Sequence, residues 1–259
     1  MSEGSPLYSH WMAEYETFKN APITEAVLEF QLRLQGDPHL GRMALVQDGI
    51  QDKYPTRKES RFVSAGIQIP AAAAPWTSVE TKQVGYTFTA ADGRQIVHAR
   101  LNAYGFSRLK PYTSWKDFRG QARTLWDHFK KIALPDRVTR VGLRYINRIE
   151  LPLPVAEFKD YILTKPDIAP GLPIMVSAYA LQMVIQDAGT GCGVTINQGI
   201  DPSCATPKVL PLIFDIDAFK EVDLAAEAQE IWTLVDQLRS LKNEVFFKSL
   251  TEKAKELFR

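Results

Sequence analysis

The stretch from residue 140 to residue 150, RVGLRYINRIE, carries the charged side chains that are best spaced for binding chemistry. In an extended strand, side chains two positions apart lie on the same face. Arg144 and Arg148 therefore share a face with Glu150, and Leu143 lies on the opposite face. Guanidinium groups bind carboxylates and phosphates through paired hydrogen bonds. The spacing predicts a candidate anion-binding site at Arg144 and Arg148.

An earlier stretch, residues 23–33, alternates in the same way and places Glu25 and Glu29 on its polar face. If the two stretches pair as neighbouring antiparallel strands, Glu25 and Glu29 face the two arginines. Such pairs form a ladder that fixes the strand register, each worth about 0.2–1 kcal/mol when exposed. This structural role is the simpler interpretation. In the functional alternative, Arg144 and Arg148 hold an anionic substrate and one of the glutamates acts as general base.

A third polar group lies in residues 95–108, where alternation places His98, Arg100 and Tyr104 on one face. With Arg108, these residues are of the types that bind single-stranded nucleic acid, because aromatic rings stack on bases and arginines neutralise phosphates. The composition argues against this function, since 31 Lys and Arg against 30 Asp and Glu leave a net charge of +1. Dedicated nucleic-acid binders are usually strongly basic. We therefore do not expect nucleic acid to be the partner.

Motifs for metals, cofactors and nucleophiles are missing from the sequence. Asp215 and Asp217 share a strand face and could bind Mg²⁺, but no third carboxylate or histidine accompanies them, which favours a solvated sheet face. The glycine cluster at residues 189–193, GTGCG, lacks the lysine of a phosphate-binding loop and favours a hairpin turn. Cys192 and Cys204 are expected to be free thiols. We expect no cofactor and no metal, and we do not expect an enzyme.

The hydrophobic pattern predicts an α+β protein, because stretches of period two alternate with stretches of helical period. Ser114 and Asp117 form a capping box that begins a helix, and Asp92-Gly93 signals a hairpin turn. We expect strands over residues 23–33, 61–69, 83–90, 95–108, 138–151, 176–187, 193–199 and 209–219. We expect helices over residues 38–53, 114–134 and 155–163, then from near 223 to a break at 246–249, and finally over 250–258, docked through Leu257 and Phe258.

The expected elements follow the order βαβββα twice, in halves 1–136 and 137–259 of one compact unit. Residues 227–232, EAQEIW, resemble residues 121–126, QARTLW, in the two closing helices. A duplication of this kind pairs the first strands of the halves at the centre of one large antiparallel sheet, covered by helices on one face. Whether the sheet is continuous or split into two packed layers is left open. The order is close to that of the TATA-binding-protein fold, but the balanced charge does not suit a basic DNA groove.

Three motifs carry a resemblance to a known family: Asn20-Ala-Pro-Ile-Thr-Glu-Ala-Val27, Gly142-Leu-Arg-Tyr-Ile-Asn-Arg-Ile149 and Phe246-Phe-Lys-Ser-Leu-Thr-Glu252. In these motifs, which span nearly the whole chain, the sequence resembles an uncharacterised, sporadically distributed family of bacterial cytoplasmic proteins of about this length. The resemblance implies a single unit and, by analogy with other patchily inherited proteins, an accessory or defence-related role. It implies no activity and no cofactor.

Taken together, these features predict a non-enzymatic binding or assembly module that uses the polar face or the edges of an antiparallel sheet. Exposed edges invite pairing, and most soluble oligomers are closed two-fold assemblies, so we expect a homo-oligomer with an unidentified protein or small-molecule partner. The alternatives are an enzyme or sensor for a small anionic ligand or nucleotide, bound by Arg144 and Arg148, and a single-stranded nucleic-acid binder. The pattern shows no signal peptide or membrane span, so we expect a cytoplasmic location and no membrane partner.

Overall fold

The computed structural model describes residues 15–36, 39–68, 76–155, 157–167, 169, 178–201 and 206–259, with the backbone alone for residues 63–68 and 76–80. Its strands are β1 (Ile23–Leu34), β2 (Thr56–Gln68), β3 (Trp76–Thr89), β4 (Gln95–Arg100), β5 (Ala103–Leu109), β6 (Pro135–Pro152), β7 (Ala180–Asp187), β8 (Cys192–Ile200) and β9 (Val209–Ala225). Its helices are α1 (Leu40–Ala44), α2 (Trp115–Ala133), α3 (Glu230–Ser249) and α4 (Glu252–Glu256), with 3-10 turns η2 (Leu45–Gln47) and η3 (Phe158–Asp160).

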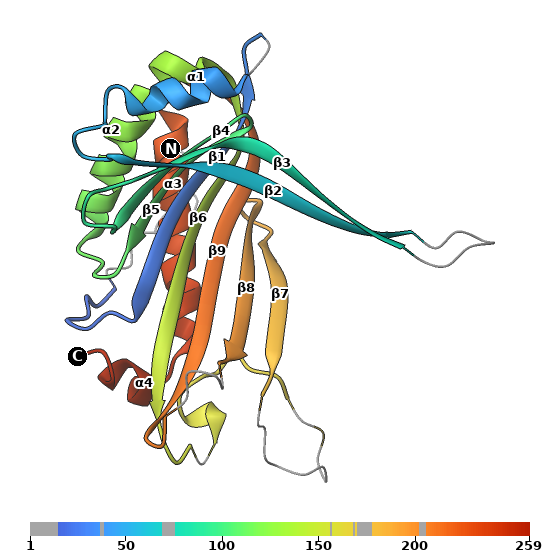
Figure 1. Cartoon of the computed structure of the whole chain (residues 1–259). Helices are drawn as coiled ribbons and strands as arrows, with labels where there is room; N and C mark the ends of the chain where they lie inside the picture. The colour runs from blue at the N-terminus through green and yellow to red at the C-terminus, as the bar shows by residue number, and fades with distance from the viewer. Residues whose placement is uncertain are drawn as a thin grey trace, which may run out of the picture.

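The nine strands form one antiparallel sheet with the order β2-β3-β4-β5-β1-β6-β9-β8-β7 (Figure 1). The predicted α+β class with a large antiparallel sheet is therefore confirmed. The sheet is continuous, and β1 pairs with β6 near its centre. Among the described residues, no helix is both long enough and apolar enough to cross a membrane.

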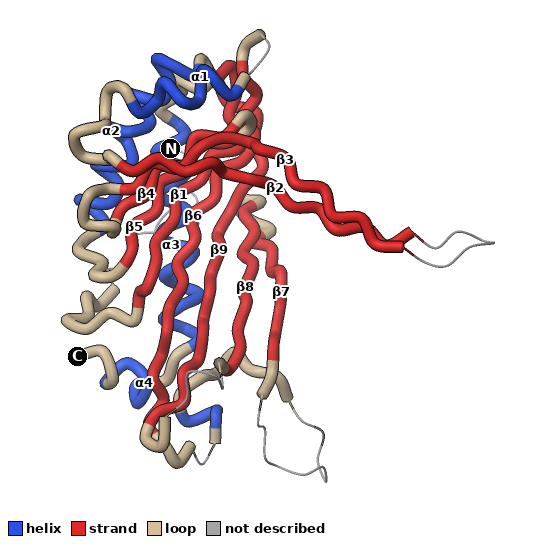
Figure 2. The backbone as a smooth tube through the Cα atoms, in the orientation of Figure 1, coloured by secondary structure: helices blue, strands red, loops and turns tan. Residues whose placement is uncertain are grey.

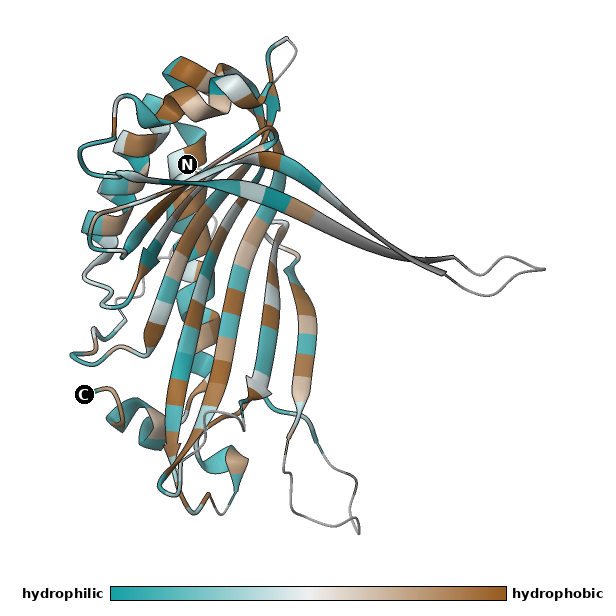
Figure 3. Ribbon diagram, viewed as in Figure 1, coloured by the Kyte–Doolittle hydropathy of each residue, from teal (hydrophilic) through white to brown (hydrophobic). Residues whose placement is uncertain are grey.

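Alternation of apolar and polar residues explains why one face of this sheet is buried. Leu28 and Phe30 of β1 and Leu143 of β6 are fully buried, and Figure 3 shows the alternation as brown and teal bands along the strands. Trp126 of α2 and Trp232 of α3 both reach Phe30, with ring centroids 5.0 and 5.8 Å away. The two long helices therefore cover the same face, and α3 packs against β6 and β9 (Figure 2).

One predicted strand, over residues 95–108, is two strands in the structure. The chain reverses at Leu101 and Asn102, so that Arg100 pairs with Ala103 across a hairpin. Backbone hydrogen bonds of 2.8 Å from Leu101 N–H and to Asn102 O tie the turn to neighbouring strands. The prediction was wrong because apolar residues continue at every second position through the turn, which hides the reversal.

The helix predicted over residues 38–53 is much shorter, because a tertiary contact interrupts it. The structure has only α1 followed by η2. His128 of α2 donates from Nε2 to Val46 O at 2.8 Å. In a continued α-helix that carbonyl would accept from Ile50 N–H, which instead donates to Gln47 O at 2.9 Å. His128 therefore occupies the Val46 carbonyl that would accept the next hydrogen bond of a longer α1 helix.

Two other helix predictions also need correction. Only η3 forms where a helix over residues 155–163 was expected, and Ile162 makes a β-bridge with Leu250 instead. At the end of the sheet, β9 continues through Asp223, so α3 begins at Glu230 rather than near residue 223. In both places the chain pairs with a distant segment: Leu163 N–H donates to Ser249 O at 2.8 Å, and β9 stays paired with β6 as far as Ala225.

A break between the two C-terminal helices is present, but it lies at the extended Leu250, since the predicted residues 246–249 still belong to α3. Thr251 caps α4, because its side chain accepts the backbone N–H of Ala254 at 3.2 Å. The short helix docks through Phe258, which is 3% exposed, whereas Leu257 is 38% exposed. Of the two predicted anchors, only Phe258 is confirmed.

The remaining predicted strands are present with shifted ends. β2 and β3 both begin earlier than expected and form a long hairpin that projects from the sheet (Figure 2). The predicted turns at residues 92–93 and 189–193 join strands, with φ of 72° at Gly93 and 68° at Gly191. Residues 38, 69, 156, 176 and 177 and Cys204, which belong to these predictions, lie outside the described residues.

Candidate functional site

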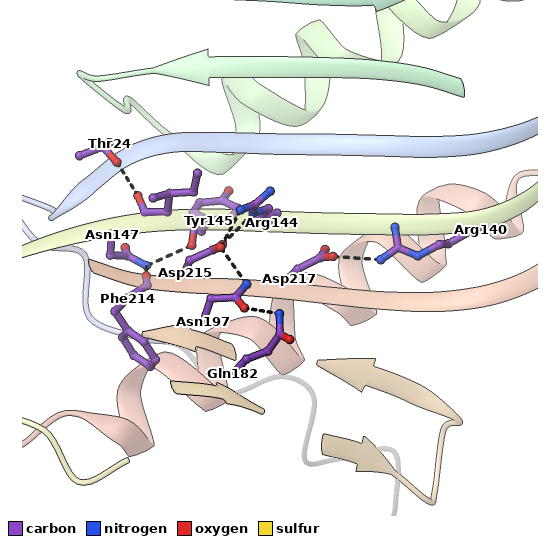
Figure 4. Close-up of polar contacts among 11 residues, drawn as sticks. Thr24, Arg140, Arg144, Tyr145, Asn147, Gln182, Asn197, Phe214, Asp215 and Asp217 are labelled. Atoms are coloured by element: carbon purple, nitrogen blue, oxygen red, sulfur yellow. Dashed lines mark hydrogen bonds and ion pairs between the residues drawn. The ribbon is translucent and has the colours of Figure 1, made fainter. Parts of the chain in front are cut away.

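The open face of the sheet carries a chain of side-chain hydrogen bonds across four strands (Figure 4). Arg144 of β6 donates to Asp215 of β9 from Nε at 2.8 Å and from Nη2 at 2.7 Å. Asp215 also accepts from Asn197 Nδ2 of β8 at 3.1 Å, and Gln182 of β7 donates to Asn197 Oδ1 at 2.8 Å. The Asp215 side chain is 6% exposed, so this network stabilises a nearly buried charge. The hydrogen bonds between Arg144 and Asp215 also raise the pKa of the Arg144 guanidinium.

The predicted ladder of Glu25 and Glu29 with Arg144 and Arg148 is wrong. In the register of β1 and β6, Val27 lies opposite Arg144. The prediction considered only one of the two strands that flank β6, whereas the guanidinium of Arg144 turns to the other, β9. Glu25 does act on Arg144 at longer range, since its charge contributes to the raised arginine pKa.

Two other predicted open-face residues, Arg100 and Arg148, have carboxylate neighbours of their own. Arg100 Nη1 of β4 donates to Glu29 of β1 at 3.3 Å. This bond crosses β5, where Gly105 lies opposite Glu29 and where a Cβ would lie 3.3 Å from the His98 side chain. Arg148 Nε lies 3.7 Å from Glu150 Oε1 on the same strand. The arginines of the candidate site are therefore neutralised by the fold itself.

Tyr104 was predicted on the open face, and the structure places it in the core instead. Its side chain is fully buried, and its hydroxyl donates to Ala122 O of α2 at 2.8 Å. The reversal at Leu101 and Asn102 is the reason, because it moves every later side chain to the opposite face. Tyr104 is therefore not exposed for stacking on a nucleic-acid base.

A second ion pair lies beside the first, between Arg140 and Asp217. Arg140 Nη2 donates to Asp217 Oδ2 at 2.9 Å, and its guanidinium lies 4.7 Å from the ring centroid of Phe219. Gly142 leaves this space open, since a Cβ there would lie 2.6 Å from Arg140 Nη1. Burial raises the pKa of Asp217, and the arginines oppose that rise. The neighbouring hollow of about 100 Å³ has room for only about three waters, which is too little for a nucleotide.

The polar groups of this face are largely paired with one another. Among the described residues, no group of three or more His, Cys, Asp or Glu side chains could hold a metal ion. Both oxygens of Asp215 are occupied by donors, and Arg144 uses two nitrogens on that carboxylate. An anion would have to displace a paired carboxylate from each of these arginines.

A pocket that the sequence analysis missed lies on the covered side of the sheet, with a volume of about 210 Å³. It is enclosed by the segment before β1, the loop before α2, the middle of β6 and the second half of α3. Lys242 of α3 lines it and is 7% exposed. Its Nζ lies 3.6 Å from the ring centroid of Tyr145 on β6.

Lys242 has a strongly perturbed environment. Burial, together with the positive charge of Arg239, lowers its pKa to about 7. The hydroxyls of Tyr145 and Tyr112 are hydrogen-bonded to each other at 2.8 Å, and burial raises the pKa of both. Glu16 is the carboxylate that lines the pocket, and it accepts from Arg259 at 2.7 Å. Among the described residues, no carboxylate pairs with Lys242.

A sequence signal for this pocket exists. Lys242 follows Leu238 by four residues and Val235 by seven, which places a lysine on the apolar stripe of its helix. Tyr145 and Asn147 likewise fall on the apolar face of their strand. A lysine within the apolar stripe of a helix is the signal for a buried amine.

Comparison with known proteins adds no relationship to this geometry. Neither a scan against protein-family models nor a search of curated proteins returned a match for this chain.

Proposed function

We propose that this chain is a non-enzymatic assembly module that binds a second copy of itself through the edges of its sheet. The observation that carries this proposal is the β2–β3 hairpin. Its strands pair along their whole length, but β4 pairs with β3 only over residues 85–89. The outer part of the hairpin therefore stands away from the sheet (Figure 1). A two-stranded ribbon is only marginally stable alone in water, so a partner surface is the natural source of its stability.

The opposite edge of the sheet supports the same function. β7 is the last strand of the sheet, so within the described part of the chain one side of its backbone has no strand partner. Val184 and Ile185 on this strand are 56% and 38% exposed. An apolar edge strand invites pairing with another strand unless it is covered, and two-fold homo-oligomers are the commonest soluble assemblies.

The open face favours a protein partner over an anionic ligand. Arg100, Arg140 and Arg144 are already paired with Glu29, Asp217 and Asp215. The alternative function, an enzyme or sensor that clamps a small anion or nucleotide through Arg144 and Arg148, therefore has weak support. Binding of single-stranded nucleic acid has weaker support still, because Tyr104 is buried.

The same proposal includes a duplicated architecture. Read outward from the β1–β6 pair, one side of the sheet has the order β1-β5-β4-β3-β2 and the other β6-β9-β8-β7. The two orders match if the second half lacks one outer strand, which supports duplicated halves at 1–136 and 137–259 and a topology like that of the TATA-binding protein. We also retain the bacterial family resemblance, with its accessory or defence-related role, and the cytoplasmic location as parts of this proposal.

The experiment that tests the proposal is a comparison of oligomeric state by light scattering after size-exclusion chromatography. In one variant, residues 62–82 are replaced by Asn-Gly, which forms a two-residue hairpin turn between the paired residues Arg61 and Gln83. In a second variant, Val184→Lys places a charge on the other edge. We expect an oligomer from the parent chain and a smaller species from at least one variant. A parent chain that is monomeric at high micromolar concentration would refute the proposal.

A further inference from the structure

The buried amine of Lys242 is the strongest chemical feature outside the open face. Its side chain reaches a pocket, and its only described partner is the face of the Tyr145 ring. A buried charge without a counter-ion is costly, so the fold stabilises either the neutral amine or a state in which a ligand occupies the pocket. A neutral, desolvated lysine amine is the nucleophile that forms imines with carbonyl compounds.

Arg239 adds a recognition element one helical turn before Lys242. It lines the same pocket, with its guanidinium 5.3 Å from the ring centroid of Trp115. Its neighbour Asp236 accepts from Arg119 at 3.0 and 2.9 Å, so that carboxylate is already engaged. A guanidinium against an aromatic wall can bind a carboxylate through two parallel hydrogen bonds.

From this arrangement we propose that the pocket binds small oxo acids, whose carbonyl carbon reacts with Lys242 while their carboxylate pairs with Arg239. The lone pair of Nζ attacks the carbonyl carbon, and a proton passes from nitrogen to oxygen to give the carbinolamine. Loss of water then forms the imine, so that one C=O and two N–H bonds are exchanged for one C=N bond and a water molecule. Both protons lost from Nζ leave with the carbonyl oxygen as water, while the amine contacts the ring of Tyr145, whose hydroxyl is hydrogen-bonded to that of Tyr112.

The charges around the amine agree with this reaction at neutral pH. The groups that face the pocket are Arg239 on the same helix, Tyr145 on β6, Tyr112 before α2, and Tyr15 and Glu16 before β1. Burial and Arg239 lower the lysine pKa to about 7, so about half of the amine is neutral at pH 7. The pKa of Lys248, on the same helix, is raised by its hydrogen bond to Glu244.

The test is reductive trapping with glyoxylate as the probe. The folded full-length chain is incubated at pH 7 with glyoxylate and sodium cyanoborohydride, which reduces an imine to a stable carboxymethyl amine. Peptide mapping then gives the labelling rate of each lysine. We expect Lys242 to react about ten-fold or more faster than Lys248, because a far larger fraction of its amine is neutral. The rate at Lys242 should rise between pH 6 and 8 and then level off.

Two variants separate the parts of the proposal. Lys242→Met should lose the rapid adduct and stay folded, as judged by circular dichroism. Arg239→Gln should lower the rate with glyoxylate several-fold more than the rate with acetaldehyde, which has no carboxylate. Equal losses with both probes would overturn the role of Arg239. Labelling of Lys242 no faster than that of Lys248, in a protein that remains folded, would overturn the site itself.

Discussion

The Nζ atom of Lys242 lies 3.6 Å from the ring centroid of Tyr145, in a pocket on the helix-covered side of the sheet. The ammonium form is stabilised by the negative face of the ring, but it receives no carboxylate among the described residues. This contact connects α3 to the central strand β6. It also places the amine in the pocket where the proposed chemistry occurs.

Lys242→Met is expected to stabilise the protein at pH 7. The lysine pKa is about 7 in the folded chain against an ordinary value of 10.5, so the unfolded state binds the proton more tightly. Stability from this group is therefore present above pH 10.5 and is lost as the pH falls to 7. In urea unfolding, the variant should have a larger free energy of unfolding than the parent chain at pH 7, and this difference should be smaller at pH 9.5. A variant that is less stable than the parent chain by the same amount at both pH values would contradict this.

His98 should make the protein acid-sensitive. Burial lowers its pKa from 6.5 to about 4, and the charge of Arg100 contributes to the shift. The Nδ1 atom of His98 has no hydrogen-bond partner among the described residues. Because the folded pKa is depressed, stability from this group is present above pH 6.5 and is lost as the pH falls through 4.

His98→Gln tests this sensitivity. The loss of unfolding free energy between pH 6.5 and pH 4 should be smaller in the variant by up to about 3 kcal/mol. Urea unfolding at closely spaced pH values gives the free energy of unfolding of the variant and of the parent chain. The difference between the two at pH 8, where His98 is neutral in both the folded and the unfolded state, is the reference. Identical pH profiles for the parent chain and the variant would show that His98 does not titrate in this range.

The ion pair of Arg144 and Asp215 should contribute more to the free energy of unfolding than an exposed ion pair does. Arg144→Gln removes two of the donors to a nearly buried carboxylate and is expected to cost about 1–3 kcal/mol. Combined with Asp215→Asn, the loss should be less than additive, because the remaining polar groups are neutral. The matched control is Arg61→Gln, since Arg61 and Glu59 are 60% and 47% exposed and such pairs contribute about 0–1 kcal/mol. Additive losses in the double variant would contradict the coupling.

Two glycines on the sheet should respond differently to alanine. At Gly85, a Cβ would lie 2.1 Å from the backbone oxygen of Ala99, whereas at Gly142 it would lie 2.6 Å from the movable end of Arg140. Gly85→Ala must shift a strand and should cost about 2–3 kcal/mol or more. Gly142→Ala should cost only about 1 kcal/mol, because the arginine can move aside. Thermal unfolding of both variants checks the order, and a reversed order would be inconsistent with the structure.

The sequence determined the features that depend on neighbours along the chain. Alternation correctly predicted which side of β1 and β6 is apolar, and the glycines at positions 93 and 191 marked real hairpin turns. Ser114 caps α2 as predicted, accepting from Asp117 N–H at 3.1 Å. In each case the deciding interaction lies within a few residues, so a local pattern is enough to predict it.

The tertiary structure decided everything that depends on which segment lies beside another. Period two shows that Arg144 faces away from the core, but only the strand order reveals that Asp215 of β9, and not Glu25 of β1, receives its hydrogen bonds. His128 shortens α1 from a position far along the chain. The buried amine of Lys242 became a site only when four separate segments enclosed it. Burial and charge pairing are set by distance in space, which a period along the chain does not encode.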